Sequence, residues 1–241
     1  MVVGASAGLG RALAQALASR GHDLFLVASD ERDLRALSSH LRQVYGVQVE
    51  HMARAISAAP GWAHEVGAAA QRGGVPDHVL FPVGGSRDDD AGGLADTDAL
   101  DILGVNLVGV MHLAAELLPA MTRAGRGSLV GFGSIAGARG RSRNVAYSAA
   151  KSALRTYFES LRHLGAAHGI EVQFYVLGYM ATQQSYGKRL PLPVASPDAV
   201  ARAIVDALGH GSRVRHLPAF WGPVEWLLRA MPFAIFRKIK S

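Results

Sequence analysis

MVVGASAGLG (residues 1–10) carries three glycines, Gly4, Gly8 and Gly10, in the spacing G-x-x-x-G-x-G. Glycine allows a tight backbone turn and a close approach to a ligand. A helix that follows such a turn directs its free N-terminal amides and its dipole toward an anion, so the segment is suited to a pyrophosphate. Ser6 adds a hydroxyl to this loop. Taken alone the pattern is weak, because close glycines also make ordinary turns between a strand and a helix.

Apolar runs of the strand type alternate with longer helical patterns along the rest of the chain. We expect strands at residues 23–27, 47–52, 78–83, 128–132, 171–177 and 213–217. We expect helices at residues 9–20, 31–44, 60–72, 98–124, 145–168 and 197–209. This alternation predicts an α/β fold with a doubly wound parallel sheet between two layers of helices. The length of 241 residues fits one domain. Only three residues precede Gly4, which predicts either a very short first strand or a start of the chain upstream of Met1.

Composition excludes several classes of protein. The chain has no cysteine, so disulfides and thiolate metal sites are impossible. Its net charge is +6, but the arginines are scattered and no nucleic-acid-binding motif is present, so no nucleic acid partner is expected. We find no secretory signal and no transmembrane span, and we predict a cytoplasmic protein. The aspartates of the loop 84–93 are expected to be solvated and to bind no metal.

A tyrosine and a lysine stand four residues apart in YSAAK, at Tyr147 and Lys151. On a helix this spacing places both side chains on one face. An ammonium beside a phenol favours the phenolate and lowers the tyrosine pKa from about 10, which suits a general acid or base. Ser134 closely follows the expected strand 128–132, at the end where open α/β sheets bind ligands, so its hydroxyl is suited to holding a substrate carbonyl. The Y-x-x-x-K pattern also occurs by chance.

Together these motifs resemble the short-chain dehydrogenase/reductase family, whose members have a single Rossmann-type domain. GASAGLG is similar to the family's cofactor loop, and GVNLVG to its active-site asparagine segment. SIAG and AYSAAKSAL are similar to its serine and tyrosine–lysine motifs, and SPDAVARAIVDAL to its late helix. The match covers nearly the whole chain in the family's order and spacing. It implies an NAD(P)-dependent oxidoreductase that transfers a hydride between a nicotinamide cofactor and a carbonyl or secondary alcohol.

The resemblance implies a role for each catalytic residue. Tyr147 exchanges a proton with the substrate oxygen, which Ser134 holds. Lys151 lowers the tyrosine pKa and binds the nicotinamide ribose, and Asn106 holds a water that links Lys151 to solvent. The residues expected to bind the cofactor are Gly4, Ser6, Gly8, Leu9, Gly10, Ser29, Asp30, Gly84, Asn106, Tyr147, Lys151, Gly178 and Thr182.

The chain departs from the family pattern on the adenosine side of the cofactor. FPVGG (81–85) replaces the usual Asn-Asn-Ala-Gly, Ala55 stands where an aspartate often contacts adenine, and LGYMAT (177–182) lacks the usual proline. None of these changes touches the catalytic set. They leave open a non-catalytic dinucleotide-binding regulator or scaffold with the same fold. An isomerase or epimerase is a third reading, although such relatives carry a larger C-terminal substrate region.

The end of the second expected strand, LVASDERDL (26–34), bears on the choice between NAD(H) and NADP(H). Ser29 falls near the position where NADP-dependent members commonly have arginine. Asp30 is close enough to approach the ribose and would repel a 2′-phosphate, whereas Arg32 is able to reach round to one. These residues favour NAD(H) slightly over NADP(H).

Three further segments bear on the substrate and on partners. The segment after Thr182, with Tyr186, Leu190 and Leu192, is expected to form a small lid over a hydrophobic substrate. GARGRSR (137–143) is either a solvated loop or an anchor for an anionic substrate such as a carboxylate or an acyl carrier, and its arginines are Arg139, Arg141 and Arg143. The aromatic and basic tail at about 219–241 suits packing on the domain or on a partner subunit, or peripheral contact with a membrane. The resemblance implies a homodimer or homotetramer.

Overall fold

Seven parallel strands form one sheet in the computed structural model, which describes residues 1–59, 61–93, 96–182 and 192–239. The strands are β1 (Val2–Val3), β2 (Leu24–Ala28), β3 (Val49–Ala53), β4 (His78–Phe81), β5 (Ser128–Ser134), β6 (Glu171–Leu177) and β7 (Arg213–Leu217). Their order is β3-β2-β1-β4-β5-β6-β7, and every neighbouring pair is parallel. The order reverses between β1 and β4, and open α/β sheets bind ligands at such a switch point.

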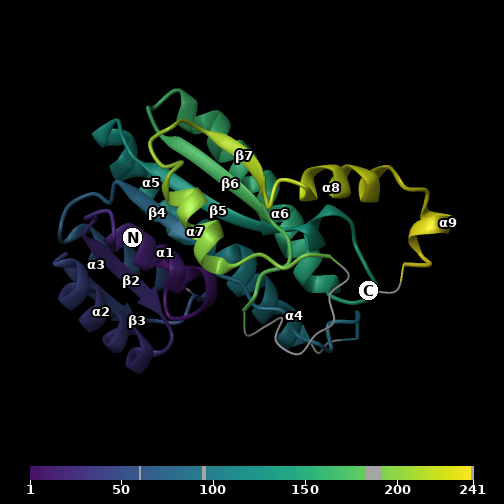
Figure 1. Ribbon diagram of the computed structural model, residues 1–241, viewed down its shortest axis with the longest axis horizontal. Coiled ribbons are helices and arrows are strands. Elements are labelled where there is room, and N and C mark those ends of the chain that lie inside the picture. Colours follow the sequence, from purple (N-terminus) through teal and green to yellow (C-terminus); the bar gives the residue numbers. More distant parts are fainter. Residues whose placement is uncertain (60, 94–95, 183–191, 240–241) are drawn as a thin grey trace.

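Helices cover both faces of the sheet (Figure 1). Those in the described residues are α1 (Gly8–Ala18), α2 (Glu31–Tyr45), α3 (Trp62–Gln71), α4 (Asp96–Leu103), α5 (Gly109–Ala124), α6 (Val145–Ala166), α7 (Pro197–Val205), α8 (Trp221–Ala230) and α9 (Phe233–Phe236). Apolar side chains of α1, α2 and α7 pack in one core cluster, and those of α3, α5 and α6 pack in a second. The strands supply residues to both clusters, so the sheet is the middle of three layers. The expected doubly wound α/β sandwich is confirmed.

The long helix expected at residues 98–124 is divided into three parts. α4 ends at Leu103, a π-helical turn spans Gly104–Val108, and α5 begins at Gly109. A π-helical turn inserts one residue into a helix, and such insertions are frequent at functional sites. This one contains Asn106, whose side chain is fully buried. The other expected boundaries differ from the observed ones by a few residues, as is usual where helix ends fray.

The stretch Thr97–Ala124 is long and apolar enough to cross a membrane by length and composition alone. Its side chains at Val110, Leu113, Leu117 and Met121 are fully buried in the second core cluster, against the sheet. A core helix of this kind meets the same criteria. We therefore describe the stretch as part of the core.

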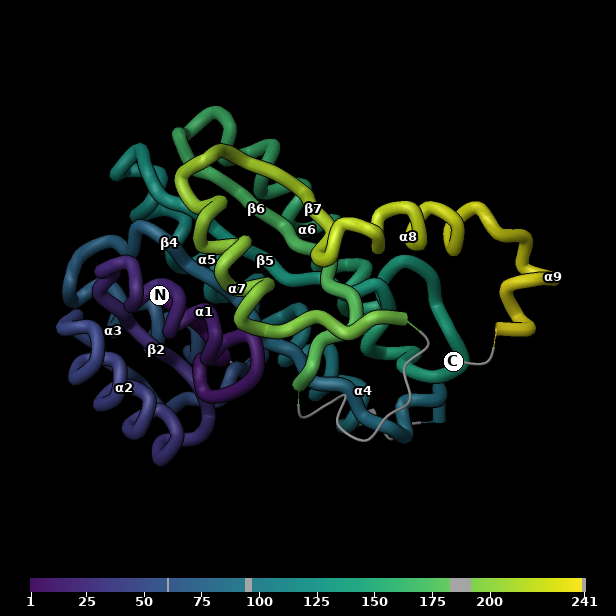
Figure 2. The backbone as a smooth tube through the Cα atoms, viewed as in Figure 1, coloured from purple at the N-terminus to yellow at the C-terminus, as the bar shows by residue number. Residues whose placement is uncertain are grey.

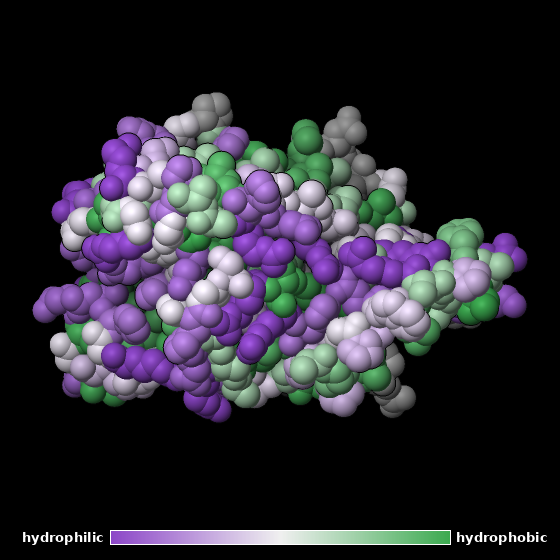
Figure 3. Space-filling model, turned by 90° about the horizontal axis from the view of Figure 1, so that it is seen from above, coloured by the Kyte–Doolittle hydropathy of each residue, from purple (hydrophilic) through white to green (hydrophobic). Residues whose placement is uncertain are grey.

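The last two helices leave the body of the molecule. α8 and α9 project to one side, at the right of Figures 1 and 2, and the projection carries apolar surface, green at the right of Figure 3. Arg139 ties this projection to the body. Its Nη1 donates a hydrogen bond to the Leu228 carbonyl at 2.9 Å, and its guanidinium carbon lies 4.2 Å from the centre of the Phe236 ring. The most exposed apolar side chains of the projection are Trp226, Leu227, Phe233 and Ile235.

Candidate active site

A large cleft of about 1430 Å³ opens at the carboxyl ends of the strands. Ligand pockets usually measure about 300–1,000 Å³, so this cleft has room for a dinucleotide beside a small substrate. It lies at the switch point between β1 and β4, where a ligand site is expected. The predicted site residues that line it are Gly4, Ser6, Gly8, Leu9, Ser29, Gly84, Ser134, Tyr147, Lys151, Gly178 and Thr182.

The glycine loop has a backbone that requires its glycines. Gly4 (φ +93°) and Gly8 (φ +49°) adopt left-handed conformations. Gly10 is needed for a different reason, because a Cβ there would lie 1.9 Å from the Gly4 carbonyl oxygen. Ala7 is the N-cap of α1 and makes no side-chain cap bond, so the first amides of α1 are left without a side-chain partner at the edge of the cleft. Such amides fit a phosphate, so the loop fits the pyrophosphate of a dinucleotide.

The segment after β6 closes the cleft from another side. A Cβ on Gly8 would lie 3.4 Å from Thr182 Cγ2, so Thr182 stands beside the glycine loop. Gly178 packs against the indole of Trp221, whose Nε1 would lie 1.7 Å from a Cβ at that position. The tail thereby adds Trp221 to the wall of the cleft, which no sequence pattern predicted. Residues 183–191 of the expected lid lie outside the described residues, and Leu192, which follows them, lines the cleft.

Ser134 and Tyr147 meet in the cleft although 13 positions separate them in the sequence. Ser134 is the last residue of β5, and Tyr147 lies in the first turn of α6. The Ala136 amide donates a hydrogen bond to Ser134 Oγ at 3.1 Å, which orients the hydroxyl. Burial raises the pKa of Tyr147 above its ordinary value, and the side-chain hydrogen bond with Ser134 acts in the opposite direction. The phenol is therefore protonated at neutral pH and has a proton to donate.

Lys151 lies one helical turn after Tyr147 and is only 4% exposed. Its Nζ donates hydrogen bonds to the carbonyl oxygens of Val83 at 3.1 Å and Phe132 at 3.2 Å, and lies 5.8 Å from the centre of the Tyr147 ring. Burial lowers the pKa of Lys151 from 10.5 to about 8. In this structure burial outweighs any effect of Lys151 on the Tyr147 pKa, so the expected lowering by Lys151 stays a prediction. The ammonium is directed at two carbonyl oxygens, and burial dominates the titration of the phenol.

Burial of Lys151 makes the stability of the protein depend on pH. The Lys151 pKa is about 8 in the folded protein against 10.5 for an ordinary lysine, so between these values the unfolded chain holds more protons at this position. The Lys151 contribution to the free energy of unfolding should therefore rise by about 3 kcal/mol from pH 8 to pH 10.5 and stay flat below pH 8. Denaturant unfolding of the wild type and Lys151→Met across this range measures the contribution as a difference. A difference that is constant with pH contradicts the prediction.

Asn106 holds the loop that follows β4. Its Nδ2 donates to the carbonyls of Gly85 at 2.8 Å and Ile102 at 2.9 Å, and its Oδ1 accepts from the Gly85 amide at 3.3 Å. A Cβ on Gly84 would lie 3.1 Å from Asn106 Oδ1 and 3.2 Å from Lys151 Nζ, so Gly84 packs closely against both residues. Asn106 itself does not line the cleft. Its side chain is engaged by the loop and not directed at a ligand.

Asp30, which was expected to contact the ribose, is not among the residues that line the cleft. Its carboxylate accepts a hydrogen bond from the Asp33 amide at 2.9 Å and so caps α2. Aspartate is among the preferred N-cap residues, so the local helix start decides its orientation. Ser29 is the residue of this turn that lines the cleft.

Asp90 corrects the expectation that the aspartates of its loop are solvated, because it is 1% exposed. Its carboxylate accepts hydrogen bonds from the amides of Ala146 at 2.9 Å and Tyr147 at 3.0 Å. Its carbonyl oxygen accepts from the amides of Asn144 and Val145. Asn144, the N-cap residue of α6, has a left-handed backbone and makes no side-chain cap bond. Asp90 therefore caps the helix that carries Tyr147.

A glycine loop suited to a pyrophosphate and a phenol with a proton to donate open into the same cleft, which is the arrangement of an enzyme that uses a dinucleotide cofactor. Comparison with known proteins narrows this class to a family. The family model described as short chain dehydrogenase matches residues 1–190, and the chain belongs to this family.

Several relatives are similar over most of the chain. An uncharacterized oxidoreductase of Myxococcus xanthus is 33% identical over 193 residues, which is 80% of this chain and 76% of the relative. The 3-oxoacyl-acyl-carrier-protein reductase FabG of Escherichia coli is 28% identical over 185 residues, covering 77% of this chain and 74% of FabG. A solved short-chain dehydrogenase from Sphingobium yanoikuyae in complex with NADPH has a TM-score of 0.83 at 24% identity, covering 100% of this chain and 95% of that one.

These findings establish the class of activity. The chain is an NAD(P)-dependent oxidoreductase of the short-chain dehydrogenase/reductase family that acts on carbonyl or alcohol substrates. The relatives named above give no support to a non-catalytic regulator.

Proposed function

We propose that this protein reduces an apolar ketone to the secondary alcohol with NADP(H) as its cofactor. The observation that carries the proposal is the placement of Ser134, Tyr147 and Lys151 in one cleft with the glycine loop. Val224 and Leu228 of α8 line the same cleft and give it an apolar wall. Residues 1–241 act in this proposal as one catalytic domain, because the cleft draws its lining from β1 through α8.

Tyr147 is the proton donor of the proposed reaction. Its buried phenol gives its proton to the substrate oxygen as the alcohol forms. Ser134 Oγ donates a hydrogen bond to the same oxygen and stabilises its developing negative charge. The Lys151 ammonium stabilises the phenolate that remains and is placed to hold the ribose hydroxyls of the cofactor. The bound nicotinamide cofactor supplies the hydride to the carbonyl carbon.

Groups around the glycine loop hold the cofactor in this proposal. The uncapped amides of α1, with Ser6 and Thr182 beside them, bind the pyrophosphate. Gly84 allows the loop after β4 to pack against Lys151, and Asn106 fixes that loop. The Asn106 side chain is engaged by the loop. A water that relays protons to Lys151 would therefore bind to the main chain of Asn106.

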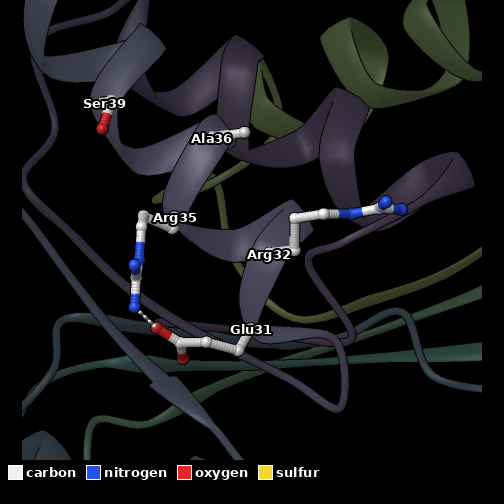
Figure 4. Close-up of a pocket in the computed structure, with 5 residues that line it drawn as sticks. All are labelled: Glu31, Arg32, Arg35, Ala36 and Ser39. Atoms are coloured by element: carbon white, nitrogen blue, oxygen red, sulfur yellow. Dashed lines mark hydrogen bonds and ion pairs between the residues drawn. The ribbon is translucent and has the colours of Figure 1, made fainter.

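The proposed preference for NADP(H) is opposite to the one that the sequence favoured. Asp30, the carboxylate expected to repel a 2′-phosphate, caps α2 and is not among the residues that line the cleft. Arg54 lines the cleft after β3 and is paired with Glu65 at 2.9 Å. Arg32 extends from the start of α2 with 89% of its side chain exposed (Figure 4). Guanidinium groups are the usual partners of a 2′-phosphate. The NADPH in the Sphingobium yanoikuyae structure agrees with this preference.

Titration of the protein fluorescence with each cofactor tests the preference. We expect NADPH to bind at least about tenfold more tightly than NADH, and the double substitution Arg32→Gln and Arg54→Gln to remove most of the difference. Arg35→Gln is the matched control on α2. Arg32 and Arg35 line the same shallow depression, but Arg35 pairs with Glu31 at 3.1 Å, whereas 89% of the Arg32 side chain is exposed (Figure 4). Tighter binding of NADH by the wild type would contradict the proposal.

We also propose that a second copy of the chain covers the projection formed by α8 and α9, giving the expected homodimer or homotetramer. The side chains of Trp226 and Phe233 are 72% and 69% exposed. Aromatic residues are enriched at interfaces between subunits, and contiguous apolar surface on a protein marks such a contact. Contact with a membrane is the competing outcome of the test below. The cytoplasmic location stays a prediction from the sequence.

Light scattering after size exclusion tests the proposed contact. The double substitution Trp226→Ser and Phe233→Ser should convert the wild-type oligomer into a monomer, since it removes the apolar surface of the interface. Val44→Ser is the control, because Val44 is 55% exposed on α2. A wild type that is monomeric and sediments with phosphatidylglycerol vesicles, in a way that the double variant loses, would replace self-association by membrane contact.

A further inference from the structure

The loop between Ser134 and Tyr147 carries three arginines whose roles the structure separates. Arg139 faces the tail, where it binds the Leu228 carbonyl and lies over an aromatic ring. Arg141 and Arg143 instead line the cleft, together with Ser134 and Tyr147. These two residues are therefore placed to meet a substrate.

The positive charges of Arg141 and Arg143 have no carboxylate partner among the residues that the structure describes. Arg141 is half-buried, and its Nε is fully buried with no hydrogen-bond partner, whereas Arg143 is exposed. In the part of the chain that the structure describes, neither guanidinium forms an ion pair with a carboxylate. Buried polar atoms almost always have a partner, and buried charges are paired. An unpartnered guanidinium nitrogen in a ligand cleft thus points to an anion that the ligand supplies.

The neighbouring charges do not fill this role. Arg87, which also lines the cleft, is paired with both Asp89 and Asp98 at 3.0 Å. Asp88 is the one carboxylate among the described lining residues, and it is engaged in an interaction of its own. The positive charge of Arg141 and Arg143 therefore remains for a ligand.

An apolar wall adjoins the arginine pair. Arg139 binds the Leu228 carbonyl, so the arginine loop and α8 lie side by side. The segment after β6 and the tail add apolar side chains to the lining of the cleft, namely Met180, Leu192, Trp221, Val224, Leu228 and Ile239. A cleft with an extended apolar wall and a few convergent polar groups orients an amphipathic ligand.

We propose that Arg141 and Arg143 form a subsite for the anionic end of an amphipathic ketone, whose apolar part lies along α8. The inference rests on the proposed function and names its substrate class. Planar guanidinium groups bind carboxylates and phosphates through paired hydrogen bonds, so either anion fits. The subsite fixes the ketone so that its carbonyl oxygen reaches Ser134 and Tyr147, which lies four residues after Arg143.

Steady-state kinetics with matched pairs of ketones tests the subsite. One pair is a medium-chain oxo fatty acid and its methyl ester, and the other is a 3-oxoacyl thioester of phosphopantetheine and the same thioester of pantetheine. The enzymes are the wild type, the double variant Arg141→Gln and Arg143→Gln, and the control Arg123→Gln. Arg123 is an exposed residue in the last turn of α5, which leads into the amino end of β5, and it does not line the cleft. NADPH affinity is measured for all three.

In the double variant we expect KM to rise at least about tenfold for the anionic member of one or both pairs, with a change below about twofold for the neutral members and for NADPH. The pair that responds identifies a carboxylate or a phosphate as the anion. Equal KM values for anionic and neutral members in the wild type, unchanged in the double variant, overturn the subsite while reduction of ketones stands. A wild type that reduces none of the four compounds with either cofactor overturns the proposed function and the subsite with it.

Discussion

Tyr147→Phe is expected to lower kcat for ketone reduction by about 10²–10⁴-fold, the usual contribution of a positioned general acid. The substitution removes one oxygen atom and keeps the ring. The bonds that hold Lys151 go to two main-chain carbonyls and do not involve the phenol, so they should remain. NADPH affinity, measured by fluorescence titration, should change by less than about twofold, because the lost group acts in the transition state.

Tyr157→Phe is the matched control for this experiment. Tyr157 lies on the same helix, and its hydroxyl donates a hydrogen bond to the Met111 carbonyl at 3.3 Å, outside the cleft. We expect its turnover to stay close to that of the wild type. Turnover by Tyr147→Phe at the wild-type level would show that another group donates the proton. A large loss of NADPH affinity in Tyr147→Phe would show that the phenol acts through the cofactor site.

The fold could be predicted from the sequence because its signals are local and repeated. Each strand–helix unit has its own apolar pattern, and the handedness of the crossovers then leaves few arrangements. The π-helical turn around Asn106 has no such pattern, since an inserted residue does not change the apolar character of the helix. For this reason one continuous helix was predicted where the structure has three parts.

The site was predictable where residue type and spacing decide it. Ser134, Tyr147 and Lys151 were predicted from their motifs, and the cleft brings all three together. Asp30 was assigned to the ribose because an acid after the second strand suits that role, but the same residue type suits an N-cap. The choice between these roles depends on the direction of the Asp30 side chain. The Asp33 amide donates a hydrogen bond to the Asp30 carboxylate, and this bond favours the cap.

Contacts between distant segments were not predictable from one sequence. Trp221 reaches Gly178 from the tail, and Asp90 reaches α6 from 56 residues upstream. Three consecutive aspartates, with nothing to distinguish the third, indicate a solvated loop. Only the packing of that loop against the start of α6 shows which of them is buried.

Asp90→Ala should both destabilise the protein and slow the reaction. The substitution leaves the amides of Ala146 and Tyr147 without their partner and removes a negative charge from the start of a helix. Loss of an N-cap together with an unsatisfied buried amide costs about 2–3 kcal/mol of unfolding free energy, or about 4–12 °C in Tm for a chain of this length. Denaturant unfolding and thermal melting measure this loss.

The effect of Asp90 on the reaction follows from its hydrogen bond with the Tyr147 amide. The Asp90 carboxylate fixes the backbone of Tyr147 itself, and small displacements of a proton donor are costly. We expect kcat to fall by about tenfold in Asp90→Ala, with NADPH affinity changed by less than about twofold. Asp90→Asn, which keeps one acceptor oxygen for the two amides, should lie between Asp90→Ala and the wild type in both Tm and kcat.

Asp89→Asn separates this role from a general effect of charge on the loop. The Asp89 side chain is 61% exposed and pairs with Arg87, so its substitution removes the same charge one residue away. We expect its kcat and Tm to stay close to those of the wild type. A lower Tm with an unchanged kcat in Asp90→Ala would mean that the cap stabilises α6 without positioning Tyr147. A graded recovery of kcat from alanine to asparagine to aspartate, absent at position 89, would instead tie the rate to the two hydrogen bonds that hold the start of α6.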